Sequence, residues 1–288
     1  MRSKLTLFFS LFFNVCLVFA QANNYYPDIL TVYFLQMATV NPGYVPSEGI
    51  ADFNAGYKFR TGAFKEISTF SFSGARILRT QNLNSHVIRI MLNNEQQGPY
   101  INTPRAYGNY AYELKTGENS SLYAGAALGV AGVYYSATSA TASVLLPDGS
   151  LGIGAKLGAV SLGISSLQIF NSKASPIVAQ FRLGRYYQSN LTLEKELGAN
   201  WNLRGHVLYR LFPENKDELN IGASLLYSET LLLGSMYRNL YGLGLIAGFY
   251  FDSGKDKLLL SFTYNSSVLS RAPVLQNSME ISLGFRVN

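Results

Sequence analysis

Hydrophobic and polar side chains alternate along most of the chain, from about residue 49 to the end. In the last segment, Met279, Ile281 and Leu283 share one side, while Glu280 and Ser282 lie on the other. Successive residues of a β-strand point to opposite faces, so alternation over about 9–11 residues is typical of a membrane-spanning strand. Four more segments alternate in the same way: 201–211, 219–227, 241–251 and 258–264.

This alternation, interrupted by polar clusters, predicts fourteen strands. They span 49–59, 67–78, 86–93, 103–115, 120–134, 151–158, 160–168, 188–196, 201–210, 217–227, 230–238, 241–252, 257–266 and 278–287. Two stretches, 136–150 and 169–187, stay open as loops or as additional strand pairs, so twelve and sixteen strands are the alternatives. An even number places both ends of the strand array on the periplasmic side of an outer membrane.

Clusters of Pro, Gly, Asp and Asn support these boundaries. Pro147-Asp148-Gly149, the region around Gly198 and the stretch Asp252–Lys255 combine residues that favour tight turns. The polar stretch 93–99 is expected to be an exposed connection.

The N-terminus has the three-part layout of a secretory signal peptide. Met1–Lys4 is basic, Leu5–Ala20 is apolar, and Val18-Phe19-Ala20 offers a cleavage site before Gln21. The apolar block is shorter than the roughly 20 residues of a transmembrane helix, which disfavours an uncleaved anchor. A lipoprotein is disfavoured as well, because the residues before Cys16 form a poor lipobox.

Residues 21–48 form a separate segment without clean alternation. It contains three prolines and an apolar, aromatic run at Leu30–Met37. So short a segment cannot span a membrane alone. We expect it to enter the barrel as a plug or to lie at the periplasmic mouth, ahead of a barrel that occupies 49–288.

The composition supports the same fold class. Hydrophobic residues make up 48% of the chain and charged residues only 14%, whereas a soluble domain has about 25% charged residues. The sequence lacks a long apolar run outside the leader, so we predict an all-β fold: a transmembrane antiparallel β-barrel of about 14 strands.

Without Arg2 and Lys4 of the leader, the 23 basic residues fall to 21 against 17 acidic ones, a net charge of +4. So mild and dispersed a charge argues against nucleic acid as a partner.

The sequence offers no pattern that supports catalysis or a bound cofactor. His86 and His206 are isolated from one another, and the single cysteine, Cys16, lies in the leader, so a metal site is not expected. The stretch Gly125–Gly129 imitates part of a dinucleotide fingerprint but lacks its strand–turn–helix setting. We therefore predict no enzyme activity, no cofactor and no metal.

Several charged residues lie on strand sides opposite the apolar stripes, and we expect them to face the lumen. These candidates are Arg204, His206, Arg210, Arg238, Arg286 and Glu280. One interpretation is an interior that neutralises itself through salt bridges, with Glu194 and Glu196 as further partners. The other is an anion-attracting lumen, which the same cations would produce if they were unpaired.

Three short motifs resemble the PorP/SprF family of the Bacteroidetes type IX secretion system. The stretch Leu35–Tyr44 ends in Asn41-Pro42-Gly43-Tyr44, which is similar to the Asn-Pro-Ala-Tyr motif of that family, with Gly43 in place of Ala. Leu233–Arg238 resembles a late Leu-Gly-x-x-Tyr-Arg strand. Ser278–Phe285 resembles the closing Ser-His-Glu-Ile-x-Leu strand, with Met279 in place of His.

The resemblance implies an outer-membrane barrel that supports secretion or surface attachment of adhesin-like proteins, in some members together with gliding motility. Its expected partners are other type IX components, the secreted proteins and outer-membrane lipid. Asn41, Pro42 and Tyr44 are the candidate partner contacts, because they lie outside the strand array. The alternative function is a porin-like or FadL-like channel for small solutes.

Overall fold

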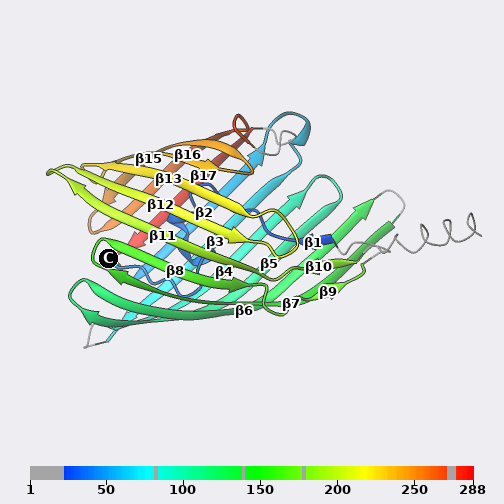
Figure 1. Cartoon of the computed structure of the whole chain (residues 1–288), viewed down its shortest axis with the longest axis horizontal. Helices are drawn as coiled ribbons and strands as arrows, with labels where there is room; N and C mark the ends of the chain where they lie inside the picture. The colour runs from blue at the N-terminus through cyan, green and yellow to red at the C-terminus, as the bar shows by residue number, and fades with distance from the viewer. Residues whose placement is uncertain (1–22, 81–83, 138–139, 177–179, 271–276) are drawn as a thin grey trace, which may run out of the picture.

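The computed structural model describes residues 23–80, 84–137, 140–176, 180–270 and 277–288. Fourteen antiparallel strands form a closed barrel (Figure 1), which confirms the predicted fold class and strand number. The barrel strands in chain order are β2 (Ala51–Arg60), β3 (Ser68–Arg79), β4 (Ser85–Gln97), β5 (Ile101–Gly117), β6 (Ser120–Ala137), β7 (Ala140–Leu157), β8 (Val160–Leu167), β11 (Tyr186–Leu197), β12 (Trp201–Leu211), β13 (Glu218–Tyr227), β14 (Leu231–Arg238), β15 (Gly242–Ser253), β16 (Asp256–Ser266) and β17 (Ser278–Val287).

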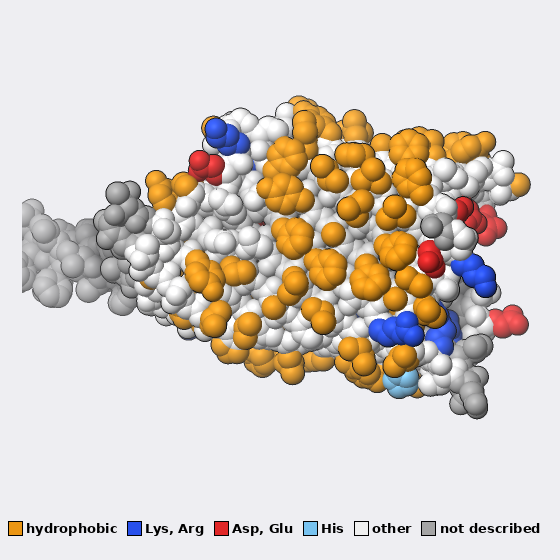
Figure 2. Space-filling model, turned by 180° about the vertical axis from the view of Figure 1, so that it is seen from behind, with side chains coloured by type: hydrophobic (Ala, Val, Ile, Leu, Met, Phe, Trp, Pro, Cys, Tyr) orange, Lys and Arg blue, Asp and Glu red, His pale blue; other side chains and the backbone are white. Residues whose placement is uncertain are grey.

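Successive side chains of the strands point alternately to the outside and to the lumen, as the sequence pattern predicts. In β16, Phe262 is 49% exposed, while its neighbours Ser261 and Thr263 are 1% and 4% exposed. Figure 2 shows hydrophobic side chains over the middle of the wall, with charged side chains towards the ends. This distribution matches a wall that faces the apolar interior of a membrane.

The two ends of the barrel differ in their connections. At one end, the turn end, short connections join β3 to β4, β5 to β6, β7 to β8, β11 to β12, β13 to β14 and β15 to β16. At the opposite loop end, longer connections join β2 to β3, β8 to β11, β12 to β13 and β16 to β17. Short turns face the periplasm in outer-membrane barrels, so the turn end is the periplasmic end. β2 begins there and β17 ends there.

The prediction that 93–99 forms an exposed connection is wrong for residues 93–97, which belong to β4 and include the buried Glu95. The long hairpin of β6 and β7 corrects a second prediction. Each of these strands has 18 residues, and β7 starts at Ala140. The predicted turn at Pro147-Asp148-Gly149 is therefore wrong, because these residues pair with β6. β8 pairs with β7 only from Ser150 onward, so no barrel strand on that side requires the N–H that Pro147 lacks.

A small sheet lies at the loop end beside this hairpin. β1 (Asn23–Tyr25) pairs in parallel with β10 (Phe181–Leu183), which pairs with β9 (Lys173–Ala174). Tyr25 and Leu183 pack with residues of β6 and β7 in one buried cluster. The start of the described chain is thus fixed at the loop end.

Aromatic side chains stand near both ends of the wall. Trp201 and Tyr227 pair at the turn end with ring centroids 4.6 Å apart, and Tyr57 and Phe59 stack near the loop end at 6.0 Å. Such rings suit the two membrane interfaces.

Within the described ranges, no helix is long and apolar enough to cross a membrane. The predicted signal peptide, residues 1–20, lies outside these ranges.

Candidate functional site

Residues 24–48, called the N-terminal segment below, run through the lumen from the loop end to the turn end (Figure 1). Prolines at 27, 42 and 46 interrupt any strand, and two short 3-10 turns occupy Tyr33–Leu35 and Met37–Thr39. Thr31, Val32 and Val40 have no exposed surface. The interior of the barrel is therefore packed around this segment.

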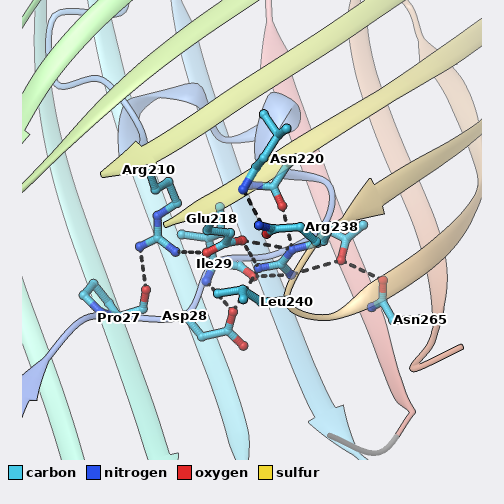
Figure 3. A network of polar contacts seen from close by, with 12 residues as sticks. Pro27, Asp28, Ile29, Arg210, Glu218, Asn220, Arg238, Leu240 and Asn265 are labelled. Atoms are coloured by element: carbon cyan, nitrogen blue, oxygen red, sulfur yellow. Dashed lines mark hydrogen bonds and ion pairs between the residues drawn. The ribbon is translucent and has the colours of Figure 1, made fainter. Parts of the chain in front are cut away.

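A cluster of charged side chains attaches the first part of the N-terminal segment to the barrel (Figure 3). The carboxylate of Asp28 accepts from Lys58 Nζ of β2 at 2.8 Å and from Arg238 Nη2 of β14 at 3.2 Å. Glu218 of β13 bridges Arg238 at 2.8 Å and Arg210 of β12 at 2.6 Å. We call this set, together with Glu280 of β17, the ionic latch.

The latch also holds the backbone of the segment. Arg210 Nη2 donates to the carbonyl of Pro27 at 2.7 Å, and Arg238 Nη1 donates to that of Ile29 at 3.2 Å. Glu280 accepts from the backbone N–H and from the hydroxyl of Thr31, both at 2.8 Å.

The charges of the latch balance. Lys58, Arg210 and Arg238 supply three cations, and Asp28, Glu218 and Glu280 supply three carboxylates, all in buried positions. Removing one partner from such a buried group leaves an uncompensated charge, which costs about 3–5 kcal/mol. Asp28 is the one charge of the latch that the segment supplies, so the docked segment neutralises the excess cation of the barrel wall.

Asn41-Pro42-Gly43 of the segment fits into a hollow of the opposite wall that consists of glycines. These are Gly125 of β6, Gly152 of β7 and Gly163 of β8. A Cβ atom on Gly152 would lie 2.0 Å from Asn41 Oδ1, and one on Gly125 would lie 2.5 Å from the carbonyl oxygen of Pro42. Only glycine leaves room for this approach. We call these three residues the glycine cradle.

Hydrogen bonds hold the motif in the cradle. Asn41 Nδ2 donates to the carbonyl of Ile153 at 2.9 Å, and Asn41 Oδ1 accepts from the N–H of Gly43 at 2.9 Å. Asn109 of β5 donates to the carbonyl of Pro42 at 2.9 Å. Asn41 and Pro42 are therefore buried and attach the segment to the wall.

A cavity of about 240 Å³ lies between the N-terminal segment and the turn end. Tyr44 lines this cavity, which we call the turn-end cavity, as does His206, whose ring stacks on Phe34 at 4.2 Å. Arg204 pairs with Glu194 at 2.8 Å. The wall of the turn-end cavity also includes Arg286, which is paired with Glu48 at 3.2 Å and with Asp52 at 3.7 Å.

The six charged candidates thus occupy two places. Arg210, Arg238 and Glu280 belong to the ionic latch, while Arg204, His206 and Arg286 line the turn-end cavity. The four arginines each have a carboxylate partner. These four pairs are of the kind that the salt-bridged interpretation of the lumen expects.

At the loop end, the start of the segment is tied to surface connections. Asn24 donates to Glu214, which also pairs with Arg182 of β10 at 2.9 Å. This hydrogen bond from Asn24, together with the charge of Arg182, lowers the pKa of the Glu214 carboxyl from its ordinary value. A second, smaller cavity of about 60 Å³ lies on the other side of the N-terminal segment from the turn-end cavity. Its lining includes Arg105, Tyr107 and Asp148.

The contacts of the latch and of the cradle attach the segment to the wall. Among the described residues, no group of three or more His, Cys, Asp or Glu side chains could hold a metal ion. The sequence pattern did not identify three central residues of the latch, Lys58, Asp28 and Glu218. Alternation shows which side of the wall a strand residue faces, but it does not reveal which residues far apart in the sequence come into contact. The inward glycines did carry a signal, since the sequence reserves small residues for one side of β6, β7 and β8.

A family model described as type IX secretion system membrane protein PorP/SprF matches residues 22–285. The chain belongs to this family. The resemblance drawn from the three sequence motifs is thereby confirmed. No individual curated protein matches the chain.

Several solved structures have a similar fold. The CymD monoaromatic hydrocarbon channel superimposes with a TM-score of 0.59 at 11% identity, covering 88% of this chain and 93% of that one. The Pseudomonas putida toluene transporter TodX gives 0.53 at 10% identity, covering 92% and 95%. A Pseudomonas aeruginosa FadL homologue gives 0.50 at 8% identity, covering 83% and 89%. At such low identity these likenesses establish an outer-membrane barrel fold.

Proposed function

We propose that this PorP/SprF protein is an outer-membrane component of the type IX secretion system that supports secretion or surface attachment of adhesin-like proteins through protein–protein contacts. The family match carries this proposal. The occupied lumen supports it, because a barrel filled by its own N-terminal segment is suited to present surfaces rather than to conduct solutes.

The turn-end cavity is the surface that we assign to periplasmic secretion components. It opens at the periplasmic end, and Tyr44 lies in its wall beside exposed charged groups such as Glu48. Asn41 and Pro42 are buried in the glycine cradle. Their part in partner binding is therefore indirect: they hold Tyr44 in place.

The double variant Asn41→Ala with Pro42→Ala tests this proposal in the native host. We expect normal insertion of the barrel, because both residues lie outside the strands, and reduced appearance of an adhesin-like protein at the cell surface. Asn102→Ala with Pro104→Ala is a matched control, since it changes the same residue types on the lipid-facing side of β5. Unchanged secretion in the first variant would contradict the proposal.

We also propose export through a signal peptide that is cleaved after Ala20. The basic start and the apolar block of the first twenty residues support this. The mass of the protein isolated from outer membranes should correspond to a chain that begins at Gln21. A mass that includes the leader would refute cleavage.

A channel for small solutes is the second candidate. Two observations favour it: cavities of about 240 and 60 Å³ flank the segment, and the similar solved barrels include a toluene transporter and a monoaromatic hydrocarbon channel. Uptake of toluene into proteoliposomes distinguishes the two functions. Protein-dependent uptake would support the channel, and its absence would support the secretion role.

A further inference from the structure

Arg76 is a cation on the lipid-facing side of the wall, and no described residue pairs with it. Arg76 of β3 is exposed, and it follows the same face as Phe70 and Leu78, which are 40% and 47% exposed. Among the described residues, its guanidinium makes no hydrogen bond or ion pair. An arginine in an apolar wall requires an anion or water to solvate it.

Strand register places Arg76 near the turn end. It pairs with Ala51, the first residue of β2, and Ala51 pairs with Val287, the last residue of β17. The turn end is periplasmic, so Arg76 lies close to the headgroups of the periplasmic leaflet. A lipid-facing Arg costs about 2–4 kcal/mol at the midplane but only about 0–1 kcal/mol near an interface.

Polar aromatic groups lie beside Arg76 on the same face. His86 pairs with Leu78, so it is the diagonal neighbour of Arg76, within reach of a long side chain. His86 Nδ1 lies 2.7 Å from the hydroxyl of Tyr110, and its ring is 4.9 Å from that of Tyr112. In either tautomer of His86, this pair leaves one N–H or O–H free to donate to a ligand.

The surroundings suit a phosphate with acyl chains attached. The flanking lipid-facing residues on this patch are uncharged, so an anion meets no repulsion there. Ile88 and Ile90 continue the face towards the loop end, and they are 57% and 60% exposed. A guanidinium matches phosphate geometry with two parallel hydrogen bonds.

We propose that Arg76, His86 and Tyr110 form a binding site for the phosphate of a phospholipid headgroup in the periplasmic leaflet of the outer membrane. The acyl chains lie along Ile88 and Ile90. The proposal depends on the barrel being in the membrane and is independent of the role in secretion.

Native mass spectrometry of the full-length protein in detergent, titrated with short-chain phosphatidylglycerol, tests the site. The wild type should bind one lipid ahead of any others. Arg76→Gln and His86→Ala should each weaken this first binding, and Arg76→Gln by about tenfold or more, since a hydrogen bond to a charged group contributes at least that much. Heat-modifiable migration in gels confirms that each variant is folded.

Lys195→Gln provides the matched control, because Lys195 is an exposed cation on the lipid-facing side of β11 near the turn end, and its diagonal neighbour is Trp201 rather than a hydrogen-bonded His–Tyr pair. It should bind lipid as the wild type does, and excess inorganic phosphate should leave the lipid bound. Equal binding by the wild type and either site variant overturns the proposal, as does an equal loss in Lys195→Gln. Displacement by inorganic phosphate would instead assign the site to the free ion.

Discussion

Filling the glycine cradle should release the N-terminal segment while the barrel stays folded. In Gly152→Ala, the new Cβ would lie 2.0 Å from Asn41 Oδ1 and 2.8 Å from Pro42 Cδ. Real Cβ contacts essentially never fall under 3.0 Å, so the Asn41-Pro42 turn must move by about 1 Å or leave the cradle. Asn41 then loses its hydrogen bond to the carbonyl of Ile153.

Two effects set the magnitude of this change. Overpacking a well-packed interior costs about 1–3 kcal/mol, and an unsatisfied buried polar group costs about 1–3 kcal/mol. Together they disfavour the docked segment by about 2–6 kcal/mol. The barrel ladder is unaffected, because the backbone of β7 keeps its partners in β6 and β8.

Limited proteolysis in detergent measures the effect. The wild-type segment should be protected, while Gly152→Ala should be cut within 24–48 and leave a resistant barrel. Gly108→Ala is the matched control, since nothing lies within 4 Å of the position of its added Cβ. Equal protection of all three proteins would refute the argument that the cradle requires glycine.

Two further changes probe the latch and the wall. Arg238→Ala should lower the free energy of unfolding by about 3–5 kcal/mol, because it leaves Glu218 and Asp28 short of a buried partner. Thermal unfolding in detergent measures this loss. The control is Arg204→Ala, which should cost about 1 kcal/mol or less because its ion pair is partly exposed. A loss from Arg238→Ala as small as that would rule out a tight latch. Leu260→Arg should hinder insertion, since a lipid-facing charge at midplane costs about 2–4 kcal/mol; normal heat-modifiable migration would mean that Leu260 does not face lipid.

The strands of the barrel could be predicted because the pattern that defines each one lies within a short stretch of sequence. Each spanning strand must present one side to lipid, so alternation, together with the polar clusters between segments, located all fourteen strands. The failure at Pro147-Asp148-Gly149 has a local cause as well. These residues favour turns, but here they lie where β7 extends beyond β8, and an unpaired edge accepts proline.

The contacts in the lumen were less predictable. Asp28 follows Pro27 in a segment without alternation, and nothing in its neighbourhood indicates that it meets Lys58 and Arg238. Such contacts depend on the path of the segment through the closed barrel. The Asn41-Pro42 motif was recognisable, but its burial among the glycines of three strands became evident only from the assembled wall.

The central claim is that the N-terminal segment closes the lumen, and single-channel recording of the purified full-length protein in planar bilayers tests it most directly. We predict that inserted barrels show no sustained conductance, and that steady channels appear once the segment is released in Gly152→Ala. A steady open conductance from every inserted wild-type barrel would contradict the claim.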